Sequence, residues 1–117
     1  MMKRLAILSG TIILLIFSTK AQEIKDKEEL DNYIMSLFKM TYVDARIQKQ
    51  IKKYVDENNY TYSGIKKALV YFFEIKGNSV EKANGGIGIV PYVYQQAYNY
   101  YYSLWLAQQK NEDKVVE

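Results

Sequence analysis

Basic and aromatic residues are the side chains of this sequence whose types and spacing could do chemistry together. Between Ala45 and Lys67, six basic side chains stand against two acidic ones. Lysine and arginine neutralise nucleic-acid phosphates, and tyrosine rings can stack on bases. The candidate interaction surface consists of Arg46, Lys49, Lys53, Lys66, Lys67, Tyr98 and Tyr102.

The same residues also fit a purely structural role. Amphipathic helices normally expose a lysine-rich face to solvent. Tyrosine rings can pack over a helical core while their hydroxyls reach water. Six tyrosines lie between Tyr92 and Tyr102, too many for one helix face, so some must reach the surface. There they either contact only solvent or recognise a protein or a nucleic acid.

Several kinds of chemistry are excluded by composition. The sequence contains neither cysteine nor histidine, which excludes disulfides, Cys/His zinc sites, thiol nucleophiles and histidine-based triads. The glycines from Gly85 to Gly88 lack the spacing of a dinucleotide fingerprint or a P-loop. No two carboxylates are spaced to converge on a substrate. We therefore expect no catalytic residue, no cofactor, no metal ligand and no enzymatic activity.

The N-terminal segment has the pattern of a targeting signal. Two basic residues precede an uncharged run from Leu5 to Phe17, which is shorter than the roughly 20 residues of a membrane span. Residues 1–21 are therefore predicted to be a signal peptide cleaved before Gln22, or an uncleaved anchor. In the second case the protein would contact a membrane through residues 5–18.

The rest of the chain is long enough for one compact domain with a single core. Outside the N-terminal segment it holds 13 basic and 13 acidic residues, so net charge gives no support for binding a polyanion. We predict a charged tether at 22–29, one helical domain at 30–110 and a loose tail at 111–117.

Apolar periodicity predicts the first two helices. An i, i+3, i+4 pattern of apolar residues indicates a helix over about 27–40. Asp44 is a suitable N-cap for a second helix beginning at Ala45, and this helix should end within the stretch Asp56-Glu57-Asn58-Asn59.

A third helix is expected to start near Thr61 or Ser63 and to stop at Gly77. Its predicted core face consists of Ile65, Ala68, Leu69, Phe72 and Phe73.

Turn-forming and β-favouring residues follow at 78–90, where we expect a loop or a short hairpin. Pro91 favours the start of a fourth, tyrosine-rich helix that runs to about Lys110. The predicted fold is all-α, a small four-helix domain with this glycine-rich loop or hairpin before the last helix. The second and third helices would suit a helix-turn-helix with residues 84–90 as its wing.

Three stretches resemble small uncharacterised proteins carried by phages and prophages of Gram-positive bacteria. They are YVDARIQKQIKKY, YTYSGIKKALVYFFEIKGNSVEKANGGIGIVPYVY and AYNYYYSLW, at 42–54, 60–94 and 97–105. The resemblance implies a cytoplasmic accessory protein, and no established activity or site residue comes with it.

Two functions fit these observations. The first is a non-enzymatic binding or accessory module of a phage or mobile genetic element, with nucleic acid or a protein as its partner. The alternative is an exported or membrane-tethered structural or interaction protein with a tyrosine-rich surface. The N-terminal segment favours export or anchoring, whereas the resemblance favours the cytoplasm.

Overall fold

The computed structural model describes the backbone of residues 2–116 and the side chains of residues 19–111. This part of the chain folds into four α-helices, one π-helical segment and one 3-10 turn, and it contains no strand. The predicted all-α fold with four helices is thereby confirmed. The helices are α1 (Met2–Phe38), α2 (Ala45–Asn58), α3 (Tyr62–Val70), η1 (Tyr71–Ile75), η2 (Val80–Ala83) and α4 (Val90–Val116).

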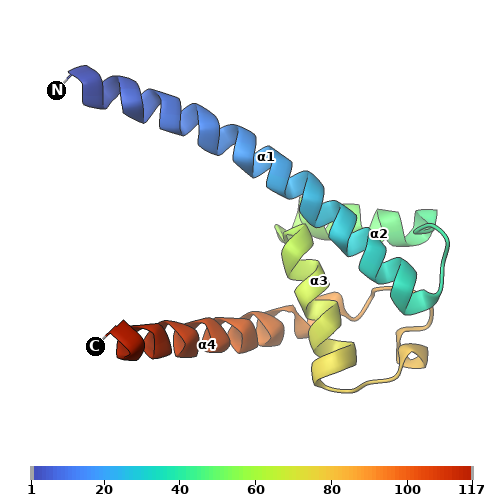
Figure 1. The fold of residues 1–117 in the computed structure, drawn as a ribbon. Coiled ribbons are helices and arrows are strands. Elements are labelled where there is room, and N and C mark those ends of the chain that lie inside the picture. The colour runs from blue at the N-terminus through green and yellow to red at the C-terminus, as the bar shows by residue number, and fades with distance from the viewer. Residues whose placement is uncertain (1, 117) are drawn as a thin grey trace.

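Helix α3 is the central element of the fold, because it contacts both α1 and α4. Figure 1 shows that α1 and α4 extend beyond the body of the domain on the same side, with the two termini at their far ends. The molecule measures 59 × 38 × 25 Å.

Helix ends agree with the capping residues in the sequence. The Asp44 carboxylate accepts a hydrogen bond from the backbone N–H of Ile47 at 2.9 Å, which caps α2. Asn59 ends the same helix in the left-handed conformation, with φ of 58°. Of the two predicted caps for α3, Thr61 is used, and its hydroxyl accepts from the Gly64 N–H at 2.9 Å. Each cap pairs a backbone group that a helix end leaves without an intrahelical partner.

Residues 22–29 are part of α1 rather than a separate tether before it. No glycine or proline interrupts the sequence from Thr11 to Phe38. Helical i, i+4 pairs also support this stretch, since Gln22 donates to Asp26 at 2.9 Å and Lys27 forms an ion pair with Asp31 at 2.7 Å. Pairs at this spacing stabilise helices that have few tertiary contacts.

The predicted signal peptide or anchor at 1–21 lies outside the described side chains, except for its last three residues. Residues 5–18, through which the membrane contact was predicted, all lie outside the described side chains. Among the helical residues that are described, no stretch is long and apolar enough to cross a membrane.

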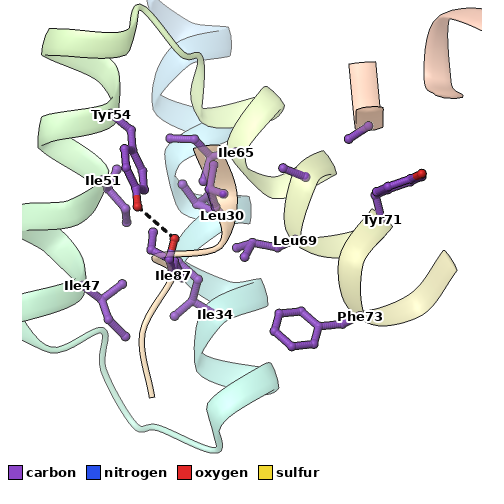
Figure 2. Packing of buried hydrophobic residues seen from close by; sticks show 13 residues of the cluster. Leu30, Ile34, Ile47, Ile51, Tyr54, Ile65, Leu69, Tyr71, Phe73 and Ile87 are labelled. Atoms are coloured by element: carbon purple, nitrogen blue, oxygen red, sulfur yellow. Dashed lines mark hydrogen bonds between the residues drawn. The ribbon is translucent and has the colours of Figure 1, made fainter. Parts of the chain in front are cut away.

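Four helices, η1 and the glycine-rich loop contribute to one hydrophobic core (Figure 2). Leu30 and Ile34 of α1 are fully buried, as are Ile65 and Leu69 of α3. The remaining buried residues are Ile47, Ile51, Tyr54, Ala68, Tyr71, Phe73, Ile87, Val90 and Ala97.

The end of the predicted third helix differs from a regular α-helix. Residues Tyr71–Ile75 form a π-helical turn, closed by a 2.9 Å hydrogen bond from the Lys76 N–H to the Tyr71 carbonyl. Because a π-turn contains one more residue than an α-turn, it shifts the side-chain register. Within this turn Tyr71 and Phe73 are buried, whereas Phe72 is only partly buried. The prediction was right for Phe73 and wrong in giving Phe72 a full place in the core.

The segment at 78–90 is a loop, not a hairpin or a wing. It contains the 3-10 turn Val80–Ala83, and its residues Asn84 and Gly85 have φ of 54° and 75°. No residue of this segment is in a strand. The loop alternative of the sequence prediction is therefore the correct one.

Side chains of α2 explain why the loop does not pair with another strand. The Gln50 side-chain oxygen accepts from the Ile87 N–H at 3.1 Å. The Tyr54 hydroxyl donates to the Ile87 carbonyl at 3.1 Å, the bond drawn in Figure 2. The Arg46 guanidinium donates to the Gly85 carbonyl. These bonds satisfy backbone groups that would otherwise need a partner strand, and Ile87 enters the core.

Candidate functional site, a groove between α3 and α4

Helix α4 carries an exposed row of aromatic rings. Tyr98 and Tyr102 are stacked, with centroids 6.1 Å apart and planes at 6°. Trp105 follows, with its centroid 5.9 Å from that of Tyr102. The three residues lie at helical spacings of four and three, which places them on one side of α4. Their exposed fractions are 59%, 49% and 52%, so a large part of each ring is available to a ligand.

These rings line a groove of about 410 Å³ whose other wall is α3. On that wall, the Lys67 ammonium lies 5.9 Å from the centroid of the Tyr101 ring, within the range of a cation–π contact. The described residues that line the groove include one cation and no carboxylate. They are Thr61, Ser63, Gly64, Lys67, Tyr94, Ala97, Tyr98, Tyr101, Tyr102 and Trp105.

One end of the groove is fixed by Tyr94. Its ring stacks on Tyr60 at a centroid distance of 3.7 Å and an interplanar angle of 5°. Its hydroxyl accepts a hydrogen bond from the Thr61 N–H at 3.4 Å. A side chain at Gly64 would collide with this hydroxyl, so glycine is what lets Tyr94 lie against the start of α3.

We expect Gly64→Ala to destabilise the domain, although alanine is the better helix former. Helix propensity alone favours alanine by up to about 1 kcal/mol, whereas overpacking costs typically about 1–3 kcal/mol. The net loss should be on the order of 1 kcal/mol in urea unfolding.

Gly88→Ala is a matched control for this substitution, because the added carbon would meet nothing closer than 3.8 Å. If Gly64→Ala were as stable as the parent or more stable, the position of Tyr94 against α3 would not depend on the absence of a side chain at residue 64.

The Tyr101 hydroxyl of the groove remains protonated at neutral pH. Burial raises the pKa of Tyr101, and the neighbouring Tyr100 and Glu74 raise it further. Burial also raises the pKa of Tyr33, which donates to Glu74 at 2.8 Å where α1 meets η1. A neutral phenol both donates and accepts hydrogen bonds, so Tyr101 adds polar capacity to the groove without adding charge.

The structure brings together three of the seven sequence-predicted residues. Lys67, Tyr98 and Tyr102 all line the groove. Lys66, the neighbour of Lys67, instead lies 3.9 Å from the Glu29 carboxylate of α1.

The other three predicted residues lie on α2. Arg46 is exposed but donates to the loop carbonyl of Gly85, which gives it a structural partner. Lys49 and Lys53 are exposed, and neither lines the groove. Of the five predicted cations, Lys67 is therefore the one that lines the groove with the tyrosines.

Trp105, Tyr94 and Tyr101 were missing from the predicted site. Their spacing was a usable signal, because all three fall on the same helical side as Tyr98. Gly64 and Thr61 could not be found in this way, since their role depends on the contact between α3 and α4. Among the described residues, no group of three acidic side chains is placed to hold a metal ion.

Comparison with known proteins places the chain among prophage proteins. A family model described as SPbeta prophage protein YorH matches residues 17–117. The SPbeta prophage-derived uncharacterized protein YorH of Bacillus subtilis (strain 168) is 40% identical over 85 residues, which cover 73% of this chain and 54% of that protein. The chain thus spans about half the length of this curated relative. No solved structure matches it.

Proposed function

Because the chain belongs to the SPbeta prophage YorH family, we propose that it is a non-enzymatic accessory module of the prophage that binds single-stranded nucleic acid in the α3–α4 groove. The observation that carries this proposal is the row of exposed, stacked rings at Tyr98, Tyr102 and Trp105 beside the Lys67 ammonium. Non-specific single-strand binding combines aromatic stacking with nearby cations.

The length of the aromatic row fits a short stretch of nucleic acid. Trp105 lies seven positions after Tyr98, which corresponds to about 10 Å along a helix. At the 3.4 Å spacing of stacked bases in one strand, this length accommodates roughly three nucleotides. Duplex DNA is a poor fit, because its bases are already stacked on one another and do not expose their faces.

Stacking has to contribute more than electrostatics to this binding. Outside the N-terminal segment the chain has equal numbers of acidic and basic residues. Among the described residues that line the groove, Lys67 is the one cation. Base–aromatic stacking contributes about 1–3 kcal/mol per base. Two or three stacked bases therefore suffice for measurable binding.

The test is a titration with a single-stranded oligothymidine of about six nucleotides, close to the smallest site sizes of single-strand binders. Trp105 is the single tryptophan of the chain, so intrinsic fluorescence reports directly on the groove. We expect saturable quenching by the single strand at low salt and much weaker quenching by a duplex of equal length.

Unchanged fluorescence at low salt, or equal quenching by both forms, would contradict the proposal. In the second case the binding would depend on backbone charge rather than on accessible bases.

A further inference from the structure

Four consecutive apolar residues are exposed on α4. Leu104, Trp105 and Leu106 have exposed fractions of 50%, 52% and 38%, and Ala107 is also exposed. With 3.6 residues per turn, four consecutive side chains point in directions that cover most of the helix circumference. The groove uses only Trp105, so it does not explain why Leu104 and Leu106 are apolar. An exposed run of this kind is unfavourable unless it forms a contact.

The run continues the face by which α4 packs on the body. Ala97 is buried, and the Tyr100 ring lies 5.5 Å from that of Tyr71 in η1. Leu104 is the next residue on this face, four positions after Tyr100. Figure 1 shows α4 extending beyond the body of the domain toward its C-terminal end, so this face of the helix is longer than the part that the body covers.

The charge pattern of α4 indicates what could cover this face. No charged residue occurs at positions 90–109, although 25% of the chain is charged. In a two-fold dimer the same patch lies on both subunits, so a charge near the axis would face its own copy and be repelled. A different protein partner, or a polyanion, would impose no such requirement for neutrality.

An exposed polar side chain next to Leu104 fits the same requirement. Gln108, four positions after Leu104, is exposed, and its side chain carries both hydrogen-bond donors and an acceptor. Such a group can pair with its own copy across a two-fold axis, which a lysine or a glutamate cannot do.

We infer that two copies of the chain associate through the face of α4 that carries Leu104 and Ala107, with the α4 helices packed against each other. This face is short, so the buried area falls at the low end of protein interfaces and the dimer should form in the micromolar range. This inference is independent of nucleic-acid binding.

Sedimentation equilibrium of the full chain over a range of concentrations tests the inference. We expect a monomer–dimer equilibrium in the parent and a monomer for Leu104→Glu, because the substitution places two like charges in the interface. Ile75→Glu is the matched control, since Ile75 is an aliphatic residue of similar exposure, 45%, on η1. It should leave the equilibrium unchanged.

Mixing variants distinguishes a direct contact from misfolding. An equimolar mixture of Leu104→Glu and Leu104→Lys should recover association that each lacks alone, because opposite charges then meet across the interface. A monomeric parent at every concentration would overturn the inference. So would a Leu104→Glu variant that still associates like the parent, or a mixture that stays monomeric while both variants keep the parent's circular dichroism.

The oligothymidine titration separates this inference from the proposed function. Leu104→Glu retains Trp105 and the aromatic row, so the monomeric variant should still be quenched by the single strand. Loss of quenching together with loss of association would contradict the independence of the two sites.

Discussion

Phe73→Ala is expected to lower the free energy of unfolding by about 3–5 kcal/mol, the range for truncating a buried phenylalanine. Phe73 is only 7% exposed, and it belongs to the core formed by α1, α2, α3 and η1. Small domains have a total stability of about 5–15 kcal/mol, so this variant should retain only part of it. Urea unfolding monitored by circular dichroism measures the difference.

Phe72→Ala is the control for this prediction, because it removes the same group one residue away. Phe72 is only partly buried, so its truncation should cost clearly less. A larger loss for Phe72→Ala than for Phe73→Ala would contradict the burial described for Tyr71–Ile75. Equal losses would fit the register predicted from the sequence, in which both phenylalanines lie in the core.

Replacing both Tyr98 and Tyr102 by alanine is expected to weaken binding of the oligothymidine by about 2–6 kcal/mol, at about 1–3 kcal/mol for each stacked base. Trp105 remains in this variant, so its fluorescence still reports binding. Both tyrosines are half-exposed, and their loss should leave the fold intact by circular dichroism.

Tyr92→Ala is the matched control for the double variant. Tyr92 lies on the same helix and is 83% exposed, but it does not line the groove. Its truncation should leave the affinity unchanged. An equal loss of affinity in Tyr92→Ala would indicate that the strand binds along a different side of α4.

Local features of the fold could be predicted from the sequence. The ends of α2 depend on Asp44 and Asn59, whose side-chain chemistry acts within a few residues. The apolar stripe of α3 identified Ile65, Ala68 and Leu69 as core residues because it follows the helical period.

Features that depend on distant contacts could not be predicted. Arg46 belongs to a basic run, and nothing local indicates that its guanidinium binds the carbonyl of Gly85, 39 residues away. The π-turn after Val70 likewise has no sequence pattern, and within it Tyr71 is buried whereas Phe72 is only partly buried.

The residues of the candidate site likewise divide into those predictable from local spacing and those that depend on contacts between helices. Spacing along α4 alone was enough to group Tyr98 with Tyr102. Pairing them with Lys67, and leaving out Lys66, required the packing of α3 between α1 and α4. Lys67 lies beside the Tyr101 ring, whereas Lys66, one residue earlier on α3, lies beside the Glu29 carboxylate.

The salt dependence of oligothymidine binding tests most directly whether the groove, and not the whole basic surface, is the binding site. For each phosphate that is neutralised on a single strand, a tenfold rise in salt concentration lowers the logarithm of the binding constant by about 0.7. With Lys67 as the cation of the groove, we predict a slope of about 0.7. A slope of roughly 3.5, the value for five neutralised phosphates, would contradict this account, because Arg46, Lys49, Lys53 and Lys66 would then contact the strand as well.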